Sequence, residues 1–195
     1  MAMICVYCAS SQRIEPRYIA LATEVGTELA RRGHGLVSGG GTVSCMGAVA
    51  CAARAGGART VGVIPQALVD MEIADHDADE LVVTHDMRER KGELDRRSDA
   101  FLALPGGIGT LEEIFDIWVA RSLGMHDKPL VVLDPDGVYA LLRAQIDDLV
   151  LRGFARPAAR DAITWTTSVA EAFDVLESHP PLSLPTVGEV LEAEP

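Results

Sequence analysis

The amino-acid sequence predicts an α/β fold with a doubly wound, Rossmann-like parallel sheet and helices on both faces. Strand-like apolar runs alternate with helix-like runs along most of the chain, which is typical of βαβ units. The strand-like runs are almost continuously apolar, as expected for strands that helices bury on both faces. Right-handed crossovers between parallel strands then place the intervening helices on the two sides of the sheet.

The expected elements follow in chain order. Strand-like runs lie at residues 3–9, 35–38, 60–64, 80–84, 100–104 and 129–133. Helix-like runs lie between and after them, at residues 16–32, 45–55, 86–97, 110–123 and 137–152. A short run at 162–165 and a helix near 168–178 complete the body. Ser168 and Glu171 have the spacing of a capping box at the start of that last helix.

The chain of 195 residues is long enough for one domain with a sizeable core, and 48% of its residues are hydrophobic. We therefore expect a single domain over residues 1–178. Residues 179–195 are rich in proline and acidic residues, so we expect them to form a poorly ordered tail.

Charge and hydropathy argue against several classes of partner. The net charge of −12 disfavours binding to a nucleic-acid polymer or to an anionic membrane surface, since both need a basic field. No run approaches the roughly 18 apolar residues of a membrane span, and the N-terminus lacks the features of a signal peptide. We therefore expect a cytoplasmic protein whose four cysteines are reduced.

No metal site is expected from the cysteines and histidines. Cys5 and Cys8 form a C-x-x-C, but they lie in a predicted strand, where residues three apart point to opposite faces. Zinc would need a second pair of ligands, and Cys45 and Cys51 do not have ligand-like spacing. The cysteines are therefore interpreted as small core residues. The remaining candidates also lack ligand-like spacing: His76, His85 and His126.

Two glycine-rich segments follow predicted strands, where open α/β sheets bind ligands. One is LVSGGGTVSCMG, which includes Gly40 and Gly41, and the other is LPGGIGTLEE, residues 104–113. Both combine backbone N–H groups with the start of a helix, which favours an anion such as a phosphate. Neither matches a Walker A loop or G-x-G-x-x-G. Tight turns that need glycine for their conformation remain the alternative.

Carboxylates cluster directly after the second glycine segment. Thr110 and Glu113 have the spacing of a capping box, which would explain Glu113 as a helix cap. A cap does not explain why Glu112 and Asp116 are also acidic, because acids beside a phosphate are unfavourable unless cations offset them. The sequence leaves two roles open for Glu113, a helix cap and a functional carboxylate.

The offsetting cations are expected in residues 86–97. Taken as a helix, this segment places Met87, Arg90, Lys91 and Leu94 on one stripe. The two apolar members make it the buried stripe, so the inward Arg–Lys pair needs anionic partners. Snorkelling or a salt bridge in the core would satisfy that need, and so would pairing with Glu113 and a ligand phosphate.

Taken together, the motifs resemble those of the Lonely Guy proteins, the cytokinin riboside 5′-monophosphate phosphoribohydrolases. PGGIGTLEE matches P-G-G-x-G-T-x-x-E, MRERK matches M-H-x-R-K, and GGGTVSCMG is similar to G-G-G-x-x-G-x-M-G. CASS at 8–11, GVIP at 62–65, RRSDAFLALPGG and LGMHDKP fit the same family. The resemblance covers roughly residues 3 to 178.

The resemblance implies a homodimeric hydrolase that cleaves the N-glycosidic bond of adenine-type, N6-modified nucleoside 5′-monophosphates and releases free base and ribose 5-phosphate. The family's catalytic pair falls on Arg90 and Glu113. No cofactor is implied. The implied nucleotide-binding positions are Glu72, Met87, Lys91, Gly106, Gly107, Ile108, Gly109, Thr110 and Glu112. The apolar segment IFDIWVARSLG, with Phe115, Trp118 and Leu123, adds a physical reason for a dimer, because it exceeds what one core is expected to bury.

Two residues depart from the family motifs. Arg88 replaces the histidine of M-H-x-R-K, but it lies off the inward stripe, and Ser44 replaces a glycine of the first glycine segment. Members have also been labelled lysine decarboxylases. The chain contains only two lysines, Lys91 and Lys128, and neither is an obvious Schiff-base lysine.

The implied chemistry suits the two catalytic candidates. Breaking the bond gives the ribose oxocarbenium character and the base negative charge, so Glu113 could stabilise the ribose and orient water. Arg90 stays protonated, which favours an electrostatic role. The alternative is a non-catalytic nucleotide-binding sensor or carrier of the same fold. An NAD(P) enzyme is disfavoured because its fingerprint is missing.

Overall fold

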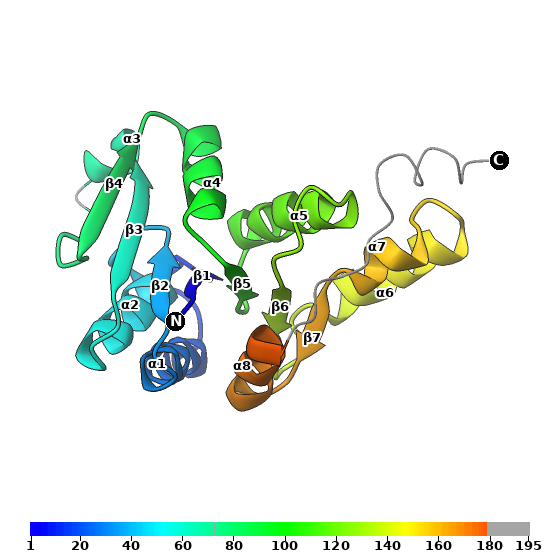
Figure 1. The fold of residues 1–195 in the computed structure, drawn as a ribbon, viewed down its shortest axis with the longest axis horizontal. Helices are drawn as coiled ribbons and strands as arrows, with labels where there is room; N and C mark the ends of the chain where they lie inside the picture. The colour runs from blue at the N-terminus through cyan, green and yellow to red at the C-terminus, as the bar shows by residue number, and fades with distance from the viewer. Residues whose placement is uncertain (72, 179–195) are drawn as a thin grey trace.

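The computed structural model describes residues 1–71 and 73–178, which form a seven-stranded parallel sheet with helices on both faces (Figure 1). The strand order is β4-β3-β2-β1-β5-β6-β7, so the predicted doubly wound α/β fold is confirmed. The expected tail at 179–195, and Glu72, lie outside the described residues. The strands are β1 (Met3–Tyr7), β2 (Gly35–Ser38), β3 (Thr60–Pro65), β4 (Glu80–Thr84), β5 (Ala100–Ala103), β6 (Leu130–Leu133) and β7 (Thr164–Thr166).

The helices follow the predicted order, with two additions. α3 and α7 were not expected, because each is too short to show a helical period. None of the helices in the described ranges is long and apolar enough to cross a membrane. The helices are α1 (Pro16–Arg31), α2 (Ser44–Ala55), α3 (Gln66–Val69), α4 (Met87–Arg96), α5 (Ile108–Ser122), α6 (Ala140–Leu151), α7 (Pro157–Asp161) and α8 (Val169–Ser178).

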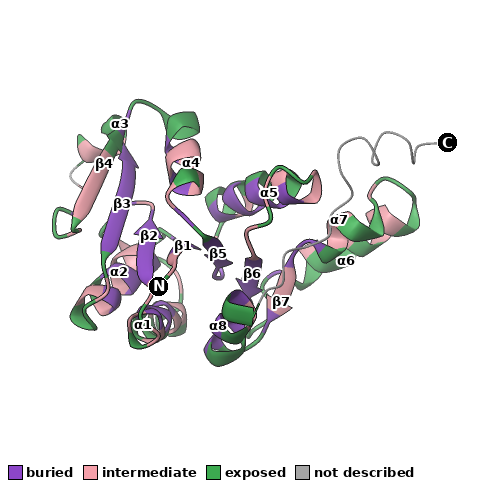
Figure 2. Ribbon diagram, in the orientation of Figure 1, coloured by how far each residue is buried: buried purple, intermediate pink, exposed green. Residues whose placement is uncertain are grey.

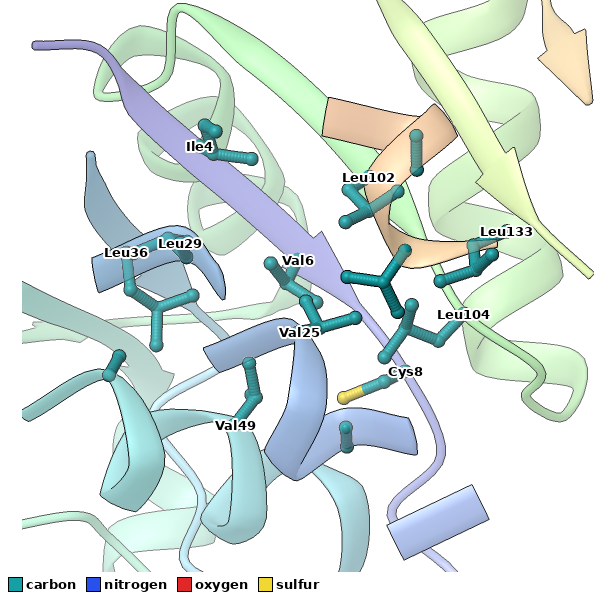
Figure 3. Close-up of a cluster of buried hydrophobic side chains, with 14 of the residues drawn as sticks. Ile4, Val6, Cys8, Val25, Leu29, Leu36, Val49, Leu102, Leu104 and Leu133 are labelled. Carbon is teal, nitrogen blue, oxygen red and sulfur yellow. The ribbon is translucent and has the colours of Figure 1, made fainter. Parts of the chain in front are cut away.

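The sheet separates two hydrophobic clusters. Alternate residues of β1 point to opposite faces: Ile4 and Val6 pack with α1, α2 and α8 (Figure 3), while Cys5 and Tyr7 pack with α4 and α5. The central strands are therefore buried along their length (Figure 2). Cys8 lies in the first cluster, so the expectation that Cys5 and Cys8 are core residues on opposite faces is confirmed.

The side of β1 on which new strands are added to the sheet changes between β4 and β5. Successive strands β1 to β4 are added on one side of β1, and β5 returns to pair with its other side, Tyr7 lying beside Ala103. The carboxyl ends of β1 and β5 thus lead into two loops that diverge to opposite faces of the sheet. Such a topological switch point is where doubly wound proteins bind ligands.

The structure excludes one candidate cap and confirms another. α5 begins at Ile108 with Gly107 as its N-cap, and the amide of Leu111 donates to the Gly107 carbonyl at 3.0 Å. Thr110 and Glu113 are therefore inside the helix, which excludes the helix cap, one of the two roles that the sequence left open for Glu113. Sequence spacing pointed to the first residue with a capping side chain, whereas a glycine N-cap needs none.

The predicted capping box of α8 is present. The hydroxyl of Ser168 accepts a hydrogen bond from the Glu171 amide at 3.3 Å, and the Glu171 carboxylate accepts one from the Thr167 amide at 3.0 Å. The back-reaching bond goes to the residue before the cap instead of to the cap itself.

Candidate active site

Helix α4 carries Arg90 to the carboxyl edge of the sheet. Asp86 caps its start by accepting hydrogen bonds from the amides of Arg88 and Glu89, each at 2.9 Å. Arg90 and Leu94 are buried, as the stripe predicted. Met87, expected to be buried with them, is 44% exposed, because the first turn of α4 extends past the strands to the rim of a cavity.

Arg90 and Glu113 form an ion pair between α4 and α5. The Arg90 Nη1 atom donates to Glu113 Oε1 at 2.8 Å, and Arg90 Nε donates to the Val63 carbonyl at 3.1 Å, near the end of β3. Only 7% of Arg90 and 8% of Glu113 is exposed. A buried pair of this kind is held by the fixed geometry of a guanidinium, whose donors lie in one plane.

The environment of Glu113 keeps its proton affinity unusually high. Burial raises the pKa of its carboxyl above the usual range, and Arg90, which favours the charged form, opposes only part of that rise. A carboxylate with a raised pKa is a better proton acceptor than an exposed glutamate, which suits a residue that handles water or a hydroxyl group.

The first glycine segment makes room for Arg90. A Cβ atom on Gly39 would lie 2.2 Å from Arg90 Nη2, so a side chain here would collide with the guanidinium. Gly40 has a φ of 69° and packs against the backbone of Gly62 and Val63, while its carbonyl accepts a hydrogen bond from the Asp75 amide at 2.8 Å. Gly41 forms a β-bridge with Ala74.

Gly40 and Gly41 were expected to bind substrate. In the structure, the backbones of both residues contact other parts of the protein. In the described chain, the missing side chains leave room for Arg90 at Gly39, for the backbone of β3 at Gly40 and for the Met46 side chain at Gly41. A role of Gly40 and Gly41 in binding substrate stays a prediction.

Lys91 faces a different set of acids from Arg90. Its Nζ lies 3.0 Å from Glu112 Oε1 and 3.4 Å from Asp116 Oδ1, and the hydrogen bond that it donates to Glu112 is the main cause of a raised Lys91 pKa. The three acids after the second glycine segment are thus divided between two cations. Because each acid has a cation as its partner, the carboxylate cluster leaves the start of α5, where the helix dipole favours negative charge, compatible with a further anion.

The start of α5 presents backbone amides to open space. The first amides of a helix have no carbonyl one turn earlier to accept their hydrogen bonds. A Cβ atom on Gly107 or Gly109 would meet no protein atom within 4 Å, and neither residue has a positive φ. Protein packing and backbone conformation therefore do not require glycine at these two positions, whereas close approach of a ligand would. Gly106 differs, because a Cβ there would lie 2.2 Å from Thr110 Oγ1.

A cavity of about 260 Å³ joins these features. Arg90 and Glu113 line it together with Met87, Glu112 and Thr110, whereas Lys91 does not. A second cavity, of about 350 Å³, lies on the other side of the α5 start and contains Gly106, Gly107 and Ile108; Ser10 and Gly109 line both. Residues that the sequence analysis did not select complete the first cavity: Cys8, Ser10, Met46, Leu68 and Ile73.

Some of the missed residues could have been found. Cys8 and Ser10 directly follow β1 at the switch point, and they belong to the CASS segment. Leu68 and Ile73 lie on or just after α3, a short helix without a recognisable motif. No group of three or more His, Cys, Asp or Glu side chains in the described ranges could hold a metal ion.

Ser44 adopts a backbone conformation that favours glycine. Its φ is 55°, and among the described non-glycine residues it alone has a positive φ. Its hydroxyl donates to the Ser11 carbonyl at 2.6 Å, so it links the start of α2 to the loop after β1. The Ser44 hydroxyl does not cap α2, because Val43 is the N-cap and no side chain caps the helix.

The sheet order and the position of the cavity define a doubly wound α/β protein with its ligand site at the switch point. Solved structures with this fold include the molybdenum cofactor binding protein of Rippkaea orientalis, with a TM-score of 0.70, 20% identity, and coverage of 91% of this chain and 96% of that one. The Moco carrier protein of Chlamydomonas reinhardtii matches with a TM-score of 0.66, 21% identity, and coverage of 90% and 95%. At this identity the likeness shows the fold alone.

Sequence comparisons give a narrower result. Residues 46–176 match a family model described as "possible lysine decarboxylase". A cytokinin riboside 5′-monophosphate phosphoribohydrolase of Mycobacterium tuberculosis is 52% identical over 87% of this chain and 90% of its own length. One from Arabidopsis thaliana is 41% identical over 91% and 83%. The chain belongs to this family, the cytokinin riboside 5′-monophosphate phosphoribohydrolases or Lonely Guy proteins.

The lysines do not fit the description of the family model. Lys91 pairs with Glu112 and Asp116, and Lys128 Nζ lies 2.8 Å from Asp95 Oδ1. A Schiff base needs a neutral amine, and the acids beside Lys91 raise its pKa and so favour the charged ammonium. The two lysines of the chain are therefore placed for ion pairing.

Gly39→Ala tests whether the guanidinium must occupy its observed position. The new Cβ should displace Arg90 and reduce turnover of a nucleoside 5′-monophosphate by about 10- to 100-fold, because small misplacements of a reacting group carry such losses. Gly26→Ala is the matched control, since its Cβ would lie 2.4 Å from the Val49 carbonyl, far from the cavity. That variant should lose thermal stability by overpacking and keep its turnover number. Equal turnover in Gly39→Ala and the wild type would contradict the role of this contact.

Proposed function

We propose that this protein hydrolyses the N-glycosidic bond of adenine-type nucleoside 5′-monophosphates, including N6-modified cytokinin forms, to the free base and ribose 5-phosphate. The observation that carries the proposal is the buried Arg90–Glu113 pair lining a cavity at the start of α5. The 52% identity to a phosphoribohydrolase of Mycobacterium tuberculosis supports the same reaction.

The start of α5 is the proposed phosphate site. The amides of the Gly107–Thr110 turn and the helix dipole favour a dianion there, and the open space at Gly107 and Gly109 allows its close approach. Ser10 lines the same space and adds a hydroxyl. Glu113, on the second turn of α5, lines the same cavity as Gly109 and Thr110, where the ribose of a 5′-monophosphate would follow the phosphate.

The two members of the ion pair stabilise the two opposite charges that develop during cleavage. As the bond from ribose to base breaks, C1′ gains positive character and the departing base gains negative charge. The Glu113 carboxylate stabilises the positive charge at C1′ and accepts a proton from the attacking water. Arg90 remains protonated and stabilises the negative charge of the departing base electrostatically. The raised pKa of Glu113 supports the role of proton acceptor.

The remaining predicted positions form the outer part of the proposed site. Met87 and Glu112 line the cavity, and Lys91 is paired with Glu112. Met46, Leu68 and Ile73 supply an apolar wall beyond the ion pair, which suits the flat, apolar face of a purine. Glu72 keeps its proposed role from the family motif.

A non-catalytic carrier is not favoured. The Moco carrier proteins share the fold at about 20% identity, whereas the relatives at 41% and 52% are named as hydrolases. A buried ion pair with a raised carboxyl pKa is also more than binding needs.

We further propose a homodimer that uses the outer face of α5. Trp118 was expected to contribute, but it is buried and donates a hydrogen bond to the Ala159 carbonyl at 2.6 Å. Phe115 and Val119, one turn apart, are 37% and 53% exposed. This apolar pair lies beside Glu112 and Asp116 on the same helix, so a subunit packed here would border the cavity.

The dimer is tested by its mass. Light scattering at micromolar concentration should give twice the mass of the chain for the wild type, and a smaller mass for Val119→Glu, because a charge would be buried in the interface. Leu141→Glu is the control, since Leu141 is exposed on α6, and it should remain dimeric. A monomeric wild type would contradict the proposal.

Substrate class is tested with paired substrates. AMP and isopentenyl-AMP should release free base, while adenosine should react slower by orders of magnitude, because each lost charge-assisted hydrogen bond to phosphate is worth about 1.5–3 kcal/mol. Chromatography of the released base measures both rates, and CMP, GMP and IMP define the base preference. Equal rates with AMP and adenosine would overturn the phosphate site.

Glu113→Gln separates chemistry from structure. The amide keeps the shape and an acceptor for Arg90 but removes the charge, so kcat should fall about 10²- to 10⁴-fold while AMP still binds. Because burial raises the pKa of Glu113, the acid limb of kcat/KM in the wild type should lie above the pH of an ordinary glutamate.

The matched control is Glu93→Gln, which removes an acid on α4 that pairs with Arg96 and Arg97, away from the cavity. It should retain wild-type turnover. If Glu113→Gln kept more than about a third of the turnover, far above the loss of an acid–base group, Glu113 would be left with a structural role between α4 and α5.

A further inference from the structure

The loop after β6 places a buried tyrosine beneath the second glycine segment. Tyr139 directly precedes α6 and is 3% exposed. Its hydroxyl donates a hydrogen bond to the carbonyl of Leu104 at 2.9 Å. Leu104 is the last residue before Pro105 and the glycines that lead into α5. A side chain from one βα loop therefore holds the backbone of another at the point where the proposed phosphate site begins.

The position of Tyr139 is itself closely determined. The carboxylate of Asp134 accepts hydrogen bonds from the amides of Val138 and Tyr139 at 2.8 and 2.9 Å. The amide of Asp134 donates to the Thr166 carbonyl at 2.9 Å, which ties this turn to β7. The Tyr139 ring packs edge-on against Trp165, with centroids 6.3 Å apart. The hydroxyl is thus presented by a turn with few degrees of freedom.

Leu104 is held from two directions. Its amide donates to the Tyr7 carbonyl at 2.8 Å, continuing the pairing of β5 with β1, and its carbonyl accepts from Tyr139. Pro105 has no N–H group, so the turn has one fewer backbone hydrogen-bond donor to stabilise it. The orientation of the Leu104–Pro105 peptide then depends on the phenol.

The phenol remains a hydrogen-bond donor at any working pH. Burial raises the pKa of Tyr139 well above its usual range, and the backbone amide of Gly106 acts on the phenol in the opposite direction.

We propose that Tyr139 is a positioning residue of the phosphate site: its hydroxyl fixes the Leu104 carbonyl, directly before Pro105 and the glycines, and so aims the first amides of α5 at the ligand. This inference rests on the proposed function only in placing the phosphate at the start of α5. Tyr139 does not line the cavity that holds Arg90 and Glu113, so its effect should fall on binding of the phosphate and leave the chemical step unchanged.

Tyr139→Phe tests the proposal, because it removes the hydroxyl and keeps the ring. The variant should bind AMP and inorganic phosphate about 3- to 10-fold more weakly by calorimetry, the change expected for one hydrogen bond. KM for AMP should rise by the same factor, with kcat within about twofold of the wild type. Affinity for adenosine, which lacks the phosphate, should be unchanged.

Thr60→Val is the matched control for a purely structural effect. Thr60 is also buried, and its hydroxyl donates to the Asp79 carboxylate at 3.1 Å at the start of β3, away from the glycine segment. This variant should lose thermal stability to a similar degree and keep the wild-type KM and phosphate affinity.

The outcomes separate the proposals. Unchanged phosphate affinity in Tyr139→Phe, or equal weakening of AMP and adenosine, would overturn the positioning role. If the wild type binds AMP without cleaving it, the proposed hydrolase function fails, and the affinity comparison still decides the role of Tyr139. If the wild type binds neither AMP nor phosphate, both proposals fall.

Discussion

The ion pair between Arg90 and Glu113 is the constraint around which this end of the molecule is arranged. Both groups are almost completely buried, and removing either partner of such a pair leaves an uncompensated charge that typically destabilises a protein by about 3–5 kcal/mol. The pair therefore sets the spacing of α4 and α5. It also explains why Gly39 lacks a side chain and why the Val63 carbonyl turns toward Arg90.

The pair is where it is because of sheet topology. α5 follows β5 at the point where the strand order reverses, and α4 follows the edge strand β4. The two helices cover the same face, so a side chain from each can meet above the carboxyl ends of the central strands. Residues 23 positions apart in the chain are thus joined at 2.8 Å.

Much of this arrangement could be predicted from the sequence, and the misses have physical causes. Periodicity placed Arg90 and Leu94 inward, because helical spacing depends only on local sequence. It also placed Met87 inward, since periodicity contains no information about where a helix leaves the core. Capping-box spacing could not decide between the two roles left open for Glu113, because its partner is the distant Arg90 and not the local helix start. Tyr139 carried no motif, and its contact with Leu104 depends on the neighbouring positions of β5 and β6.

Ser44 combines local backbone strain with a hydrogen bond to a distant part of the chain. A non-glycine residue in the left-handed region raises the conformational energy of the backbone by about 1 kcal/mol or more, and glycine would relieve it. The serine hydroxyl instead reaches the Ser11 carbonyl, across 33 positions of sequence. The loop after β1, which carries Ser10 into both cavities, is thereby tethered to the first turn of α2. The same helix carries Met46 into the first cavity, so one strained serine joins two segments that line the cavity and lie far apart in the sequence.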